Sequence, residues 1–139
     1  MLFSLKPQAQ SLKLLSSDYY RMTILENIEV WKKSVQLGKD IYSICRSNSH
    51  IKNDYGIRDQ IQRSAVSIAS NIAEWNDRDS DKEFVRFLHI ARWSCSELKT
   101  QLLIIEDLLD VAIYNKLLEQ TIEIHKMLNK FIQKIKSDI

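Results

Sequence analysis

The clearest helical pattern in the chain is SDKEFVRFLHIARWSCSELKTQLLIIEDLL, residues 80–109. Ser80 and Glu83 form an S-x-x-E capping box, which predicts a helix that begins at about Asp81. The apolar positions that follow recur in steps of three and four, as they do on the buried side of a helix. This stretch predicts the longest helix of the chain, over about 81–109, with a core side of Phe84, Phe87, Leu88, Ala91, Ser94, Leu98, Leu102 and Ile105.

Two further segments before this stretch have the same periodicity. The first predicts a helix over about 25–46, in which Gly38 would let two helices approach closely. Its apolar side is Ile28, Trp31, Val35, Gly38, Tyr42 and Cys45. The second predicts a helix over about 56–75, with Ile57, Ile61, Ala65, Ile68 and Ile72 on one side.

The last segment predicts a helix over about 113–136 with two apolar stripes. Two stripes indicate either a wide buried side or a contact with another subunit, and we expect an oligomer on this ground. The first stripe is Tyr114, Leu118, Thr121, His125, Leu128, Ile132 and Ile135. The second stripe is Leu117, Ile124 and Phe131.

Composition supports an all-α protein. The 139 residues include two glycines and one proline, too few for the turns of a sheet protein. Short connections between the helices predict one domain over 23–139, an up-down-up-down, left-handed antiparallel four-helix bundle. We interpret residues 1–22 as a disordered leader, or as sequence upstream of a start at Met22 rather than Met1.

Two features indicate a cytoplasmic protein. Cys45 and Cys95 lie within apolar helical patterns, as buried free thiols do in a reducing compartment. No run approaches the roughly 20 apolar residues of a membrane span, so we expect no membrane association.

The charge pattern leaves two interpretations of the basic residues. The net charge of +2 belongs to residues 1–22, since residues 23–139 carry as many acidic as basic side chains. Nucleic-acid binding must therefore depend on where the cations lie, either as a solvated surface or as a strip that binds phosphates. The candidates for nucleic-acid contact are Arg58, Lys82, Arg86 and Arg92, with a ridge of Lys126, Lys130 and Lys134.

No pattern for catalysis is present. None of the three histidines follows a glutamate at the i, i+3 spacing of a di-iron bundle, and no phosphate loop or nucleophile motif occurs. Glu74 and Glu97 are the acids nearest the predicted core, and we expect them to form structural ion pairs with Arg63, Arg78 or Arg92. The sequence therefore predicts a protein without enzymatic activity, metal or cofactor.

Several of these residues also occur in the motifs of a known family. They include LENIEVW at 25–31, YGI at 55–57, QIQRSA at 60–65 and NIAE at 71–74, followed by Phe84, Ser94 and Glu97. Together they resemble the bacterial four-helix-bundle family encoded in intervening sequences of 23S ribosomal RNA genes. That family is similar to the accessory variability determinant of diversity-generating retroelements. The likeness covers about 25–136, and 60–74 is its most specific part.

The resemblance implies a homopentamer of bundles around a central channel and no known enzymatic activity. For the intervening-sequence branch it implies a function that is not established, with RNA association as an expectation. For the retroelement relatives it implies binding to nucleic acid and to a reverse transcriptase, which is our alternative. The residues that match the family's polar motif would join the second and third helices or line the assembly: Arg63, Asn71, Glu74, Arg78, Ser94 and Glu97.

Two residues depart from that family pattern. Trp75 and Trp93 stand where the family has glycine. Because tryptophan adopts left-handed backbone poorly, the second helix is expected to end differently or to extend beyond Trp75. We expect the two rings to pack together or against a neighbouring subunit.

Overall fold

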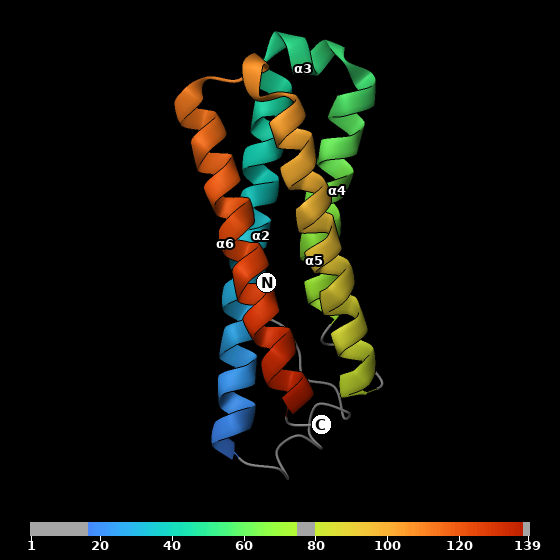
Figure 1. Ribbon diagram of the computed structural model, residues 1–139, viewed down its shortest axis with the longest axis vertical. Helices are drawn as coiled ribbons and strands as arrows, with labels where there is room; N and C mark the ends of the chain where they lie inside the picture. The colour runs from blue at the N-terminus through green and yellow to red at the C-terminus, as the bar shows by residue number, and fades with distance from the viewer. Residues whose placement is uncertain (1–16, 75–79, 138–139) are drawn as a thin grey trace.

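Four long helices form the protein in a computed structural model that describes residues 17–74 and 80–137. Figure 1 shows them side by side, with each long helix running opposite to the one before it in the chain. The described segments contain no strand. In chain order the elements are α2 (Ser17–Ser47), α3 (Ser49–Asn53), α4 (Tyr55–Ala73), α5 (Asp81–Ile104), the 3-10 helix η3 (Glu106–Leu108) and α6 (Val111–Ser137).

The helices pack around one apolar core. Helix α2 contacts α4 and α6, and α5 also contacts α4 and α6. The seam between α2 and α4 therefore lies on the opposite side of the bundle from the seam between α5 and α6. The side chains that are fully enclosed include Leu37, Ile41, Ile61, Ile68, Phe84, Leu88, Leu98 and Leu117. Each such side chain contributes about 1.5–3 kcal/mol relative to an exposed one.

Helix α5 follows its prediction at the start and departs from it at the end. The Ser80 hydroxyl accepts a hydrogen bond from the backbone N–H of Glu83 at 3.1 Å, which confirms the cap. The predicted core side is buried, except that Phe87 is half-buried. The helix ends at Ile104 rather than 109, because the chain tightens into η3 and turns Leu109 inward. At 24 residues α5 is shorter than α2, which has 31, so its predicted rank as the longest helix is wrong.

The predicted apolar side of the first helix is wrong by one position, except for Cys45, which is buried as predicted. The buried residues of α2 are instead Asn27, Val30, Ser34, Leu37, Ile41, Ile44 and Cys45. Two of these are polar, which hid the stripe from a pattern of apolar residues. Ser34 is accommodated because its hydroxyl donates to the Val30 carbonyl oxygen at 2.8 Å. The predicted stripe lies beside the core, where Gly38 has no atom within 4 Å of an added Cβ, so the close helix approach predicted there is also absent.

The ends of the other helices differ from the prediction by a few residues or less, except at the start of α2. That helix begins at Ser17 instead of about 25, so the predicted boundary at 22–23 falls within a helix. No glycine or proline interrupts the chain between Pro7 and Gly38, and each added helical residue gains a backbone hydrogen bond. Residues 1–16 lie outside the described segments.

The connection after α2 contains structure that periodicity did not predict. The Asn48 carboxamide oxygen accepts hydrogen bonds from the backbone N–H groups of His50 and Ile51, which caps the short helix α3. Its amide nitrogen donates to the Leu108 carbonyl oxygen at 2.8 Å and so joins this connection to η3. Five residues are too few for a helical pattern to emerge.

The second stripe of the last helix lies inside the protomer. Leu117, Ile124 and Phe131 are all buried, and Phe131 contacts Phe84 of α5 edge to face, with ring centres 5.7 Å apart. The two stripes together form one wide buried side, with His125 and Leu118 half-buried at its margin. The second stripe is therefore explained by the wide buried side and gives no support for an oligomer, which stays a prediction.

Two features bear on the predicted location of the protein. None of the helices in residues 17–74 and 80–137 combines the length and the apolar character needed to cross a bilayer. Cys45 and Cys95 are both free and buried.

Candidate nucleic-acid interface

Three residues of α4 and α5 form a hydrogen-bonded cluster between the two helices. The Ser94 hydroxyl of α5 lies 2.8 Å from the Ser67 hydroxyl of α4 and 3.0 Å from the Ile90 carbonyl oxygen. The Asn71 amide nitrogen donates to the carbonyl oxygen and the hydroxyl of Ser67, at 2.8 and 3.1 Å. Ser94 and Asn71 of the predicted polar motif are thus brought together across the helix pair.

A polar cleft of about 620 Å³ lies over this cluster. Arg63 of α4 and Glu97 of α5 both line it, and Trp93 stands at its side. Glu74, which belongs to the same motif, caps the C-terminus of α4 instead. Arg78, the last motif residue, lies outside the described segments.

The predicted contact between the two tryptophans concerns one described residue. Trp75 lies outside the described segments, and α4 ends before it, at Ala73. Trp93 is 56% exposed and stacks on the ring of His89, with centres 6.0 Å apart and 28° between the planes. An exposed indole that is already held on one side offers a rigid surface for a second flat ring.

Cationic and neutral donors line the outer seam between α5 and α6. The Arg92 guanidinium donates to the Asn129 carboxamide oxygen at 3.0 Å, across the two helices. Burial lowers the pKa of His89, and the nearby charges of Arg92 and Lys136 lower it further. Burial likewise lowers the pKa of His125, and the nearby charges of Arg92 and Lys99 lower it further. We name this surface the α5–α6 seam and define it as His89, Arg92, Lys99, His125, Asn129 and Lys136.

Arg92 is the shared member of this arrangement. Its charge contributes to the lowered pKa of a histidine on each helix, and one lysine contributes to each as well. The positive potential of the seam is therefore local, although the helical domain as a whole carries almost no net charge. Such a local field attracts an anion that can approach both helices at once.

Other predicted nucleic-acid residues lie beside the seam or far from it. Lys126 and Lys130 are exposed on α6, each one residue after a seam position, and Lys82 and Arg86 are exposed on the first half of α5. Lys134 forms an ion pair with Glu26 of α2 at 2.7 Å, which joins α6 to α2.

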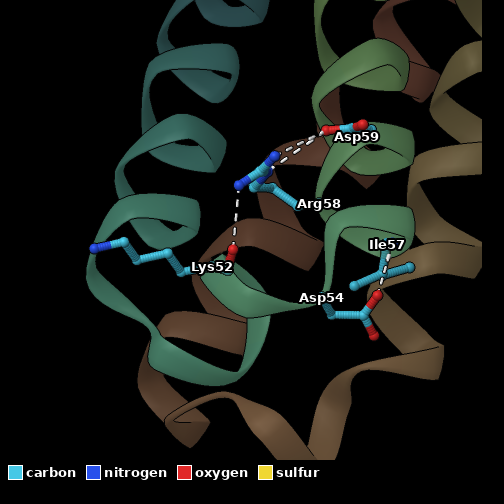
Figure 2. A network of polar contacts seen from close by, with 5 residues as sticks. All are labelled: Lys52, Asp54, Ile57, Arg58 and Asp59. Atoms are coloured by element: carbon cyan, nitrogen blue, oxygen red, sulfur yellow. Dashed lines mark hydrogen bonds and ion pairs between the residues drawn. The ribbon is translucent and has the colours of Figure 1, made fainter.

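Arg58 lies at the start of α4 and is tied to its neighbours (Figure 2). Its guanidinium donates to the Lys52 carbonyl oxygen at 3.2 Å and pairs with Asp59 at 3.5 Å. It also lies over the Tyr55 ring, 4.6 Å from the ring centre. These contacts hold the connection between α3 and α4 together.

Sequence reasoning named Arg92 but missed its companions in the seam. His89, Arg92 and Lys99 recur at helical spacing on α5, and His125, Asn129 and Lys136 do so on α6. Either series alone is unremarkable for a solvent-facing side. The seam becomes visible only when the two helices are known to pack together.

A metal centre has no counterpart in the part of the chain that the structure describes. There, no three side chains of histidine, cysteine, aspartate or glutamate come close enough to hold a metal ion.

Comparison with known proteins identifies the family. Residues 26–130 match the family described as 23S rRNA-intervening sequence protein. The fold is similar to a crystal structure from Bacteroides thetaiotaomicron, described as a protein of unknown function from the S23 ribosomal protein family. That likeness has a TM-score of 0.72 and 24% identity, and it covers 78% of this chain and 98% of the other. No curated protein matches the sequence. Since the family match spans most of the chain, this protein belongs to the 23S rRNA-intervening sequence protein family.

Proposed function

We propose that this protein is a non-enzymatic, cytoplasmic homo-oligomer, five left-handed bundles in a ring, that binds single-stranded RNA through the α5–α6 seam. The observation that carries the binding is the position of Arg92, whose guanidinium donates to Asn129 at 3.0 Å and so lies across the two helices of the seam. RNA is the candidate because the family is named for intervening sequences of 23S rRNA.

The seam has the two components that single-stranded nucleic acids require. Its cations, with Lys126 and Lys130 beside them, would neutralise backbone phosphates. Trp93 borders the seam through its stacking on His89, and its exposed indole would stack on a base. This combination favours binding with little sequence preference, since every base has a flat ring and every nucleotide a phosphate.

The ring would strengthen this binding without new contacts. Each protomer presents one seam, and five seams on one particle would let a single strand engage several of them. Modest affinity at each seam is then sufficient, in keeping with the near-neutral charge of residues 23–139.

Binding is tested by fluorescence polarisation of a labelled uridine oligomer against the wild-type protein at several salt concentrations. We expect Arg92→Gln combined with Lys126→Gln and Lys130→Gln to weaken binding at low salt. The slope of log K against log salt should fall by about 0.7 for each phosphate that the variant no longer neutralises. Arg58→Gln is the matched control, since this guanidinium lies at the start of α4, outside the seam. There it donates to the Lys52 carbonyl oxygen and pairs with Asp59.

Three outcomes would contradict the binding proposal. The first is a wild-type protein that does not bind at low salt, and the second is a triple variant that binds as tightly as the wild type. The third is an Arg58→Gln variant that weakens binding as much as the triple variant does. A deoxyuridine oligomer of the same length distinguishes RNA from DNA, and tighter binding of the DNA would overturn the assignment to RNA.

A further inference from the structure

The α5–α6 connection forms an apolar tip with acidic side chains. We define this tip as residues 103–113. Ile104 and Val111 are 72% and 74% exposed, and Leu103, Leu108 and Ile113 are exposed as well. Glu106, Asp107 and Asp110 are the charged residues of the tip, and all three are acids. An exposed apolar surface of this kind, bordered by charge, is typical of an interaction site.

A hollow between α2 and α4 has the opposite charge. This α2–α4 groove has a volume of about 350 Å³, and Gly38 and Ala69 are among the small residues that line it. Tyr42 and Val66 are exposed apolar residues of its lining. Space remains open at its floor, since an added Cβ at Gly38 would meet no atom within 4 Å. Its charged residues are Lys39 and Arg46, both basic.

Most charges of the two surfaces have no ion-pair partner among the described residues. Within residues 17–74 and 80–137, no ion pair reaches Lys39 or Arg46 in the groove, nor Glu106 or Asp107 at the tip. Asp110 differs, because its carboxylate accepts hydrogen bonds from the backbone N–H groups of Ala112 and Ile113 and caps α6. Two free carboxylates and two free cations, each beside exposed apolar side chains, are complementary surfaces.

The tip of one protomer is unable to fill its own groove. The groove lies on the α2–α4 seam. The tip connects α5 and α6, which lie on the other side of the bundle (Figure 1). We propose that the tip of a second copy of this chain docks into the α2–α4 groove, with Glu106 and Asp107 against Lys39 and Arg46. Such a contact joins two different surfaces, the tip of one protomer and the groove of the next. Repeating it from protomer to protomer produces a ring when the rotation between neighbours adds up to a full turn.

This inference rests on the proposed homo-oligomer and names the surfaces that hold it together. It also orients the seam that binds RNA. The groove and the α5–α6 seam lie on opposite sides of the bundle, so a partner in the groove leaves the seam free.

The test is the solution mass of the full-length protein by light scattering, with a charge-reversal cycle. Lys39→Glu with Arg46→Glu reverses the groove, and Glu106→Lys with Asp107→Lys reverses the tip. We expect each double variant to fall to a protomer or a smaller assembly while circular dichroism keeps its helical signal. The quadruple variant restores opposite charges across the contact and should recover the mass of the wild type.

A steric variant tests the groove independently of charge. Gly38→Leu fills the open space with a better helix former, so the protomer should keep its helical signal and lose the assembly. Gly56→Ala, at the start of α4, is the matched glycine control and should leave the mass unchanged.

The outcomes separate this contact from the proposed function. Double variants or Gly38→Leu with the mass of the wild type would overturn the contact, as would a quadruple variant that stays dissociated. A wild-type protein that is itself a single protomer would overturn the homo-oligomer as well. Loss of RNA binding with the assembly intact would concern the seam alone.

Discussion

The hydroxyl pair between α4 and α5 supports a quantitative prediction about the polar motif. Ser94 and Ser67 contact each other at 2.8 Å, and each keeps another partner when the other is replaced. Ser94 retains the Ile90 carbonyl oxygen, and Ser67 retains the amide of Asn71. Because neither single replacement leaves a buried group without a partner, we expect each to cost about 0.5–1.5 kcal/mol rather than the larger penalty of an orphaned group.

A double-mutant cycle isolates the contribution of the pair. Ser94→Ala, Ser67→Ala and the double variant are compared with the wild type by urea unfolding at one protein concentration, followed by circular dichroism. With a slope of roughly 2 kcal/mol per molar urea, a loss of 1 kcal/mol lowers the midpoint by about 0.5 M. The double variant should lose less than the sum of the singles, because the shared contact is removed once.

Replacing serine by alanine also favours the helix, so this effect needs its own control. Ser96→Ala lies on the same helix at an exposed position and measures the gain in helix propensity alone. The result that would falsify the view that this pair joins α4 to α5 has two parts. The slope of the free energy of unfolding against urea is unaltered, and the losses of the two single variants add up to that of the double variant within about 0.3 kcal/mol.

Three further predictions concern other parts of the fold. Ser80→Ala removes the cap of α5 and should lower the free energy of unfolding by about 1 kcal/mol, whereas Ser80→Asp should retain it; equal losses in thermal unfolding would contradict this role. Burial raises the pKa of Cys95 to about 12, so its thiol should resist alkylation until the protein unfolds; rapid labelling of the native protein, measured by mass spectrometry, would refute it. His89 and His125 have pKa values below 6.5 in the folded state, so the unfolded chain binds more protons between these values and 6.5. Stability should therefore fall as pH drops through that window, and His89→Gln with His125→Gln should weaken the dependence in urea titrations at a series of pH values.

The same histidines connect stability to RNA binding. A bound phosphate favours the protonated imidazole, so it raises the pKa that burial and the neighbouring cations lower. RNA affinity should accordingly increase as the pH falls toward 6, in the range where the free protein loses stability.

The helices and most of their buried sides are predictable from the amino-acid sequence. Ser80 with Glu83 located the start of α5, and the isoleucines of α4 located its core, because local hydrogen bonds and a period of 3.6 residues leave a direct mark in the chain. The family was also readable, through motifs such as NIAE at 71–74.

Which of two neighbouring sides of α2 faces the core depends on the packing of the helices. Both sides have enough apolar residues to be buried. The buried one includes Asn27 and Ser34, and the free-energy cost of burying these polar groups depends on what packs around them. In the same way, the structure placed the second stripe of α6 inside the protomer. The seam around Arg92 and the tip and groove that we propose as partners bring together residues from different helices. No local pattern records such surfaces, since their physical basis is the packing of segments distant in the chain.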